Sequence, residues 1–200
     1  MTQVALARHL DSYPFSERYG WLEDKYGLSW QLIYTNLEGE ERPLIIPSLM
    51  FVGDICGKAE EASDFYLSVF KDSRRGALAR YPAGMEPEQE GAIMFTDFKL
   101  EGQWFVAMDS AQTHDFAFNE AVSLIVRCKD QEEIDAYWDR LSAVPEAEQC
   151  GWIKDNGTAS STTSAPATAS ATFPTLAFSP AISNNLCAFS PVGLRVPNMT

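Results

Sequence analysis

The 200-residue sequence is short of the groups that mark several common classes of protein. It has only two histidines, and its four cysteines show no Cys-x-x-Cys spacing, which argues against a zinc knuckle or a disulfide framework. Its 15 basic residues stand against 28 acidic ones, and the formal net charge is -13. Nucleic acid and anionic membrane surfaces both need a basic patch, so we expect neither as a partner.

Long apolar runs and targeting signals are missing as well. No uninterrupted apolar run approaches the ~18 residues of a membrane-spanning helix, and the N-terminus lacks a basic region followed by an apolar one. These absences predict a cytoplasmic protein with reduced cysteines. A Gly-rich turn after a first parallel strand is also lacking, so the sequence predicts no nucleotide-type cofactor such as S-adenosylmethionine, and no other cofactor.

The chain does contain a regular pattern of strands and helices from residue 44 onward. A continuous apolar run over residues 44–52 predicts a buried strand, and the helical spacing of apolar residues over 57–70 predicts a helix. A second helix is expected after Asp130, which stands three residues before a Glu as in a capping box. Further strands are predicted at residues 75–81, 92–100, 103–108 and 121–128.

The N-terminal part shows a different arrangement. Residues 4–10 are interpreted as the end of a helix, and residues 21–24 and 28–35 as a hairpin that turns at 25–27. Residues 36–43 are polar and rich in chain breakers, which favours a linker.

A short internal repeat relates this N-terminal part to a later stretch. At an offset of 131 positions six identities fall within fifteen residues: Leu10/Leu141, Pro14/Pro145, Glu17/Glu148, Gly20/Gly151, Trp21/Trp152 and Asp24/Asp155. Such a repeat predicts the end of one structural module (1–35) followed by nearly all of a second (44–155).

Composition changes abruptly after Asp155. All 28 acidic residues precede this point, and Arg195 is the only charged residue beyond it. Residues 156–200 are rich in Ser, Thr, Ala and Pro and lack periodicity, so we expect a largely disordered tail. The tail is interpreted either as a native flexible extension or as the product of a frame change or altered splice, because the break falls inside the repeat.

Several phrases carry a family resemblance. Val52-Gly53-Asp54, residues 59–70, Gly91-Ala92-Ile93-Met94-Phe95, Ala107-Met108-Asp109-Ser110 and residues 150–155 resemble the PhnB-like branch (3-demethylubiquinone 3-methyltransferase-like) of the vicinal oxygen chelate superfamily, which includes glyoxalases and bleomycin-resistance proteins. The resemblance implies an α+β fold of βαβββ-type modules with curved, mixed or antiparallel sheets around a small-molecule site. It also implies pairing of modules within a chain or across a homodimer. The branch's methyltransferase label finds no support in the sequence.

The metal chemistry of this superfamily transfers poorly to the chain. Metal-dependent relatives hold a divalent ion with a His on the first strand and a Glu on the last. Here Gln31 stands at the position of that Glu, and no His occurs near Pro47-Ser48. His9 and His114 alone cannot complete a two-His-one-carboxylate site in one subunit. We therefore predict no metal.

Two residues are candidates for catalysis. His114 beside Asp115 is either a general base or part of a solvated loop, and Asp109 is either a buried functional acid or a strand-end acceptor of backbone hydrogen bonds. Residues that could contact a ligand share aromatic, apolar or amide side chains on strands, where core packing is the competing interpretation. They are Gln31, Trp30, Phe95, Phe105, Met108 and Trp152.

The leading hypothesis is a protein that binds a small aromatic or apolar molecule in a sheet-lined cavity, with no demonstrable enzymatic activity. One alternative is a metal-dependent lyase or dioxygenase that takes ligands from a partner subunit, and another is an inactive, truncated two-module protein. We also expect the hairpin over 21–34 to fill the sheet position that the second module lacks, in the same subunit or across a dimer.

Overall fold

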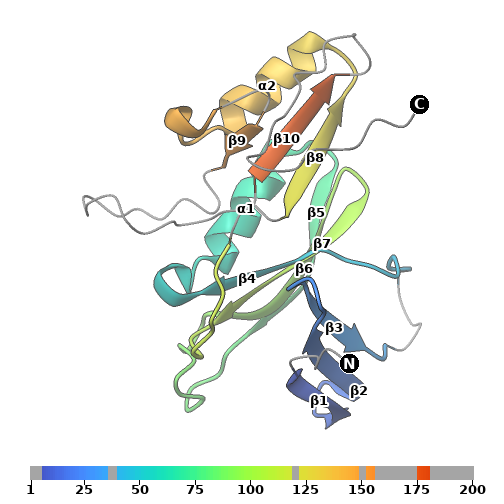
Figure 1. Cartoon of the computed structure of the whole chain (residues 1–200), viewed down its shortest axis with the longest axis vertical. Helices are drawn as coiled ribbons and strands as arrows, with labels where there is room; N and C mark the ends of the chain where they lie inside the picture. Colours follow the sequence, from blue (N-terminus) through green and yellow to red (C-terminus); the bar gives the residue numbers. More distant parts are fainter. Residues whose placement is uncertain (1–5, 36–39, 119–121, 149–151, 156–174, 181–200) are drawn as a thin grey trace. The chain divides into compact units, whose positions relative to one another are not determined.

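A computed structural model describes residues 6–35, 40–118, 122–148, 152–155 and 175–180 (Figure 1). The chain divides into two compact units, Met1–Pro43 and Leu44–Thr200. Each unit is described by itself below.

The first unit is a small antiparallel sheet in the order β1-β2-β3 (Figure 1). Its strands are β1 (Leu6–Tyr13), β2 (Ser16–Glu23) and β3 (Ser29–Ile33). The expected hairpin is therefore present as β2 and β3. Asp24 closes its turn: the carboxylate accepts hydrogen bonds from Tyr26 N at 2.8 Å, Leu28 N at 3.1 Å and Trp30 Nε1 at 2.9 Å. The bond from Trp30 is the largest of the effects that lower the pKa of Asp24.

The expected helix end at residues 4–10 is wrong over its described part, because β1 is a strand that pairs with β2 from Leu6↔Leu22 to Tyr13↔Ser16. Pairing with β2 satisfies the backbone groups that an isolated helical turn would leave open. Gly20 permits the close approach of the strands, since a Cβ there would lie only 3.2 Å from the Leu10 Cα. Pairing with β2 has here overridden the weak helical pattern of the sequence.

The first half of the second unit is a four-stranded sheet with one helix. Its elements are β4 (Ser48–Val52), a single 3-10 turn (Gly53–Ile55), α1 (Ala59–Val69), β5 (Ser73–Arg80), β6 (Ile93–Leu100) and β7 (Gln103–Ser110). The sheet order is β4-β7-β6-β5, with β4 parallel to β7 and the other pairs antiparallel. The predicted order of strand, helix and three strands is confirmed.

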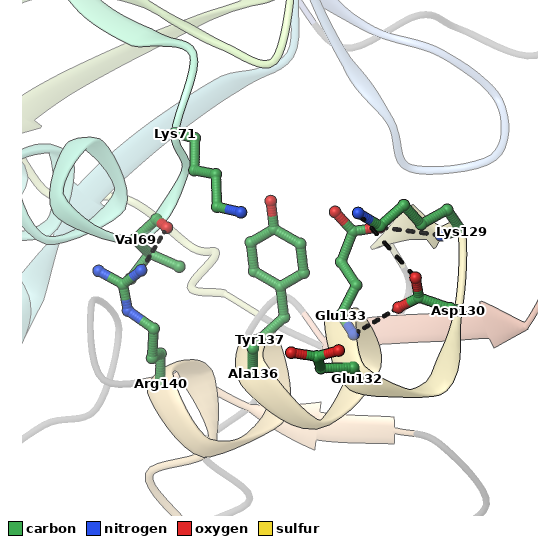
Figure 2. A pocket seen from close by; sticks show the side chains of 9 residues that line it. All are labelled: Val69, Lys71, Lys129, Asp130, Glu132, Glu133, Ala136, Tyr137 and Arg140. Carbon is green, nitrogen blue, oxygen red and sulfur yellow. Dashed lines mark hydrogen bonds and ion pairs between the residues drawn. The ribbon is translucent and has the colours of Figure 1, made fainter.

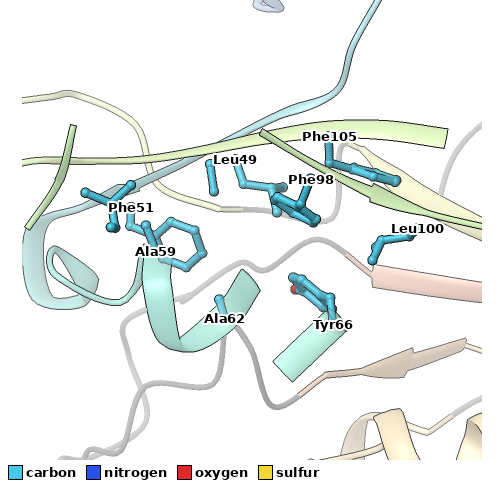
Figure 3. Packing of buried hydrophobic residues seen from close by; sticks show 10 residues of the cluster. Leu49, Phe51, Ala59, Ala62, Tyr66, Phe98, Leu100 and Phe105 are labelled. Atoms are coloured by element: carbon cyan, nitrogen blue, oxygen red, sulfur yellow. The ribbon is translucent and has the colours of Figure 1, made fainter. Parts of the chain in front are cut away.

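Helix α1 covers one face of this sheet and forms the main core with it (Figure 3). Phe51, Phe98 and Phe105 contribute from the sheet, and Ala62 and Tyr66 from the helix. The small side chain of Ala62 lets the helix approach closely, and the stacked rings of Phe98 and Phe105 lie 5.7 Å apart between centroids.

The second half contains β8 (Ser123–Cys128), α2 (Gln131–Leu141), a 3-10 turn (Pro145–Ala147), β9 (Trp152–Lys154) and β10 (Thr175–Pro180). Asp130 is the N-cap of α2 and accepts a hydrogen bond from Glu133 N at 2.9 Å, as the sequence pattern predicts. Strands β8, β10 and β9 form a sheet in that order (Figure 1). Of the tail expected to be disordered, 175–180 is this strand, and 156–174 and 181–200 lie outside the described residues.

Two polar contacts and a small core join the halves of this unit. The Tyr66 hydroxyl donates to Asp155 Oδ2 at 3.0 Å, and both residues are buried. Arg140 on α2 donates to the carbonyl oxygens of Val69, at 2.9 Å, and Ser68. The two contacts anchor β9 and α2 to α1, because the guanidinium satisfies carbonyls that the end of α1 leaves open.

Neither α1 nor α2 could cross a bilayer, since each has 11 residues, and none of the described helices is long and apolar enough to do so.

Candidate functional site at the end of strand β7

Asp109, near the C-terminal end of β7, is a buried acceptor of backbone hydrogen bonds. Its Oδ1 accepts from Gly57 N at 2.7 Å and Ala59 N at 3.1 Å, and its Oδ2 accepts from Ile93 N at 2.9 Å. The side chain is directed to the start of α1, where unpaired N–H groups favour a carboxylate. Burial raises the pKa of Asp109, and the three backbone bonds oppose this rise. Of the two roles proposed from sequence, this geometry is that of the strand-end acceptor.

The next residue, Ser110, is the centre of a polar cluster. Its Oγ lies 2.8 Å from His114 Nε2 and 3.5 Å from Glu88 Oε1, and the residue is 7% exposed. Glu88 is held by Ala111 N, which donates to Oε2 at 2.8 Å, and by Gln112 Nε2, which donates to Oε1 at 3.1 Å. We call Glu88, Ser110, Gln112 and His114 the polar cluster. It presents a hydroxyl and an imidazole side by side, the groups that exchange a proton or bind an oxygen atom.

The polar cluster adjoins the sheet face opposite α1, which we call the open face. Along β7, Phe105 and Ala107 belong to the core under α1, so the alternating residues Trp104, Val106 and Met108 point to the open face. Met50 pairs with Met108 across the parallel strands β4 and β7, and both are half-buried. The open face thus has an apolar floor that leads to Ser110.

Two cations cover the other end of this floor. The Arg74 guanidinium lies 4.9 Å from the Trp104 ring centroid and the Lys99 ammonium 5.8 Å from it, so the indole is only 2% exposed. Beside them Asp97 Oδ1 accepts a hydrogen bond from Ala77 N at 2.5 Å. A Cβ at Gly76 would lie 2.1 Å from the same Oδ1, so only glycine fits there. The open face is therefore charged around Trp104, carries the Asp97 carboxylate beside Val106, and is apolar at Met50 and Met108.

The ligand-binding residues predicted from sequence lie on several different strands. Met108 lies on the open face, and Phe95 on β6 is 37% exposed, whereas Phe105 is buried in the core beneath α1. Gln31 and Trp30 lie in the first unit, where Gln31 Oε1 accepts from the Tyr19 hydroxyl at 2.9 Å and Trp30 is bonded to Asp24. The backbone of Trp152 belongs to β9, and its side chain is not among the described parts of the structure.

Three residues of the polar cluster, Glu88, Ser110 and Gln112, were not singled out from sequence. Glu88 belongs to an acidic loop over residues 83–90. Ser110 could have been noticed because it follows Asp109 at a strand end and precedes His114 by four residues.

Neither described free cysteine has the features of a reactive thiolate. Burial raises the pKa of Cys56, with the charges of Asp109 and Glu88 adding to the rise, and burial also raises the pKa of Cys128. A thiol with a raised pKa is a poor nucleophile at neutral pH.

A hollow of about 170 Å³ lies beside the start of α2 (Figure 2). Its walls carry both signs of charge: Lys71, Lys129, Asp130, Glu132, Glu133 and Arg140. Tyr137 lines it as well and hydrogen-bonds Glu101 Oε1 at 3.3 Å, and burial, followed by the charge of Glu101, raises the pKa of Tyr137 to about 12. The opposed charges leave no clear preference for an ion, so we place the candidate site on the open face.

The described side chains offer no preformed metal centre. Nowhere among them do three His, Cys, Asp or Glu side chains gather closely enough to hold an ion. In the polar cluster both His114 and Glu88 contact Ser110, and the Asp109 carboxylate is engaged by three N–H groups.

One family model and several solved structures are similar to this chain. The family model described as 3-demethylubiquinone-9 3-methyltransferase matches residues 43–160. A putative 3-demethylubiquinone-9 3-methyltransferase, PhnB protein, from Bacillus cereus is 31% identical, over 68% of this chain and 100% of that one, with a TM-score of 0.49. A gene product from Arabidopsis thaliana is 18% identical, over 68% of this chain and 97% of that one, with a TM-score of 0.41. No curated protein matches.

The match over residues 43–160 and the βαβββ order of the second unit define an α+β protein of the vicinal oxygen chelate superfamily. Within that superfamily the chain belongs to the PhnB-like family, whose model carries the description 3-demethylubiquinone-9 3-methyltransferase.

Proposed function

We propose that this protein binds a small apolar or aromatic molecule on the open face of the four-stranded sheet, without a metal ion. The observation that carries the proposal is the alternation along β7. Ala107 and Asp109 serve the core and the start of α1, which leaves Met108 and Ser110 adjacent on the opposite face. An apolar floor beside a few fixed polar groups is the usual composition of a small-molecule site.

The polar cluster would orient the bound molecule. Glu88 is fixed by Ala111 N and Gln112 Nε2, and it lies close enough to Ser110 to restrain the hydroxyl. His114 shares its Nε2 with that hydroxyl and stacks at a tilt on Phe116, with the ring centroids 4.9 Å apart. A ligand oxygen that displaces one of these bonds would meet a donor already in place, which lowers the entropy cost of binding.

The contacts of the acidic side chains at the site support binding without metal. Asp109 accepts three backbone bonds, and Glu88 accepts from a backbone and a side-chain amide. In the first unit the neutral Gln31 takes the position at which the resemblance places a metal-binding Glu, and it bonds Tyr19. A divalent ion would have to displace these contacts, whereas an uncharged ligand leaves them intact.

The proposal extends to a homodimer in the cytoplasm. In most domains both faces of a sheet are covered by another layer, and a second copy of the chain would lie across the open face and enclose the bound molecule between the two layers. Sedimentation equilibrium tests this: a mass of about twice 22.2 kDa is expected, and a monomer at every concentration contradicts it.

Calorimetric titration with menadione, a small naphthoquinone, tests the binding site. We expect saturable binding that is unchanged by EDTA. Met108→Gln should weaken it about tenfold, because an amide replaces an apolar contact worth roughly 1.4 kcal/mol. The matched control is Met85→Gln in the acidic loop, where the side chain is 44% exposed, and it should bind as the unaltered chain does.

The same titration distinguishes the metal-dependent alternative. Binding that is lost with EDTA, or a stoichiometric divalent ion in the purified protein, overturns metal-independent binding. Equal affinities of Met108→Gln and Met85→Gln for menadione would show that the open face is not the binding site.

A further inference from the structure

The hollow beside the start of α2 lies where the two halves of the second unit meet (Figure 2). Val69 and Lys71 reach it from the end of α1 and the segment after it, whereas Lys129, Glu133 and Tyr137 belong to the other half. Its volume of about 170 Å³ equals that of five or six water molecules, at ~30 Å³ each. The hollow therefore has room for a molecule of about six non-hydrogen atoms.

Two side chains of opposite charge are available to a ligand in this hollow. In Figure 2 the Tyr137 hydroxyl lies between the Lys71 ammonium and the Glu133 carboxylate. Glu133 Oε2 accepts from Lys129 N at 2.8 Å, which fixes the carboxylate and leaves Oε1 outside that bond. Lys71 is held through its backbone N–H, which donates to Glu101 Oε1 at 3.1 Å, and the described residues give its ammonium no partner.

A strained turn residue holds the Tyr137 hydroxyl in this position. Glu101, between β6 and β7, has a φ of 46°, in the left-handed region that costs free energy for any residue except glycine. Its Oε1 accepts from Lys71 N and, at 3.3 Å, from the Tyr137 hydroxyl, so one carboxylate contacts both halves of the unit. The pKa of Tyr137, raised to about 12 by burial and then by Glu101, keeps this hydroxyl protonated at neutral pH. Backbone strain of this kind is concentrated at ligand sites.

We propose that the hollow binds a free α-amino acid with a small side chain. The Lys71 ammonium pairs with the carboxylate of the ligand, and Glu133 Oε1 and the Tyr137 hydroxyl oxygen accept hydrogen bonds from its ammonium group. A simple anion or cation would meet a wall charge of its own sign, whereas a molecule that carries both charges satisfies both walls. Val69 and Ala136 supply the apolar part of the lining, which suits a methyl side chain.

An NMR titration of the isotope-labelled full chain with L-alanine tests this site. Propionate and ethylamine are the comparison probes, because each lacks one of the two charged groups of L-alanine. We expect saturable shifts of the Lys71, Glu101 and Glu133 amides with L-alanine, and binding of either comparison probe that is about tenfold weaker or more. Lys71→Met should weaken L-alanine about tenfold without weakening ethylamine. Glu133→Gln, whose amide oxygen can still accept from Lys129 N, should weaken L-alanine similarly without weakening propionate.

Lys58→Met and Asp139→Asn are the matched controls, because each removes one charge of the same sign from an exposed side chain of the second unit outside the hollow. Both should bind L-alanine as the unaltered chain does. The proposal is overturned if L-alanine shifts none of the three amides, or if propionate or ethylamine binds the unaltered chain as tightly as L-alanine. It is also overturned if Lys71→Met and Glu133→Gln bind L-alanine no more weakly than their controls. The comparison of the three probes needs no variant, so it decides the matter even where a variant does not fold.

Discussion

The buried carboxylate of Asp109 offers the sharpest test of the reasoning about the second unit. Asp109→Ala removes the acceptor for three backbone N–H groups, those of Gly57, Ala59 and Ile93, and leaves them in a dry environment. Each unsatisfied buried donor costs about 1–3 kcal/mol, while relief from burying the carboxylate offsets part of the total. We expect a loss of roughly 3–5 kcal/mol in the free energy of unfolding.

Asp109→Asn tests the role of the carboxylate charge, because the substitution removes the charge and keeps the shape of the side chain. The amide oxygen can still accept from Gly57 and Ala59, but its NH2 group faces the Ile93 N–H, so one bond is lost at about 1–3 kcal/mol. The order of stability should be unaltered chain, Asp109→Asn, Asp109→Ala. Asp54→Asn is the control, because Asp54 is exposed and its change should stay within about 0.5 kcal/mol.

The pH dependence of the free energy of unfolding provides an independent test, because the direction of the change is fixed by the pKa of Asp109. Because the pKa of Asp109 is raised in the folded state, folding favours its protonated form, and its contribution is fully present below the unfolded pKa and lost as pH rises through the folded one. The stability difference between the unaltered chain and Asp109→Asn should therefore shrink as the pH rises above about 4, the usual pKa of an Asp side chain in an unfolded chain. Urea unfolding followed by circular dichroism measures it. A difference that grows with pH, or an Asp109→Ala protein as stable as the control, would refute this account.

Three further outcomes follow from other contacts. Gly76→Ala should destabilise the fold by about 1–3 kcal/mol in urea unfolding, because the new Cβ would lie 2.1 Å from Asp97 Oδ1; a neutral effect would contradict the close approach. Asp130→Ala should cost about 1 kcal/mol through loss of the α2 cap, and Asp130→Asn, which can still cap, should recover most of it. Glu101→Gln should lower the pKa of Tyr137 from about 12, seen in the ultraviolet titration of tyrosinate, and an unchanged pKa would exclude Glu101 as a cause.

The order of elements in the second unit could be predicted because its patterns are strong. The helix expected over 57–70 is α1 (Ala59–Val69), and the strands around it carry continuous or alternating apolar residues. β10 could not be found this way, since its place depends on pairing groups that β8 and β9 present in three dimensions. Likewise, residues 6–13 form strand β1 because β2 is available for pairing, and their own sequence does not indicate a strand.

The candidate site was only partly accessible to sequence reasoning. Phe105 and Met108 were proposed together, but they are three positions apart on one strand and must face opposite sides of the sheet, so strand alternation alone separates them. The roles of His114 and Asp109 were left open because each depends on partners distant in sequence. Gly57 and Ala59 lie about 50 positions before Asp109, and Glu88 precedes Ser110 by 22.

The bond between Tyr66 and Asp155 has a consequence for the order in which the chain folds. It spans 89 positions and ends at the residue after which composition changes. A nascent chain can form the four-stranded sheet and α1 once β7 has been synthesised, but the Tyr66 hydroxyl stays without this acceptor until Asp155 has been synthesised. Pausing of translation before that codon would leave the second unit half formed. The part of α1 around Tyr66 would then be exposed to solvent and to chaperones.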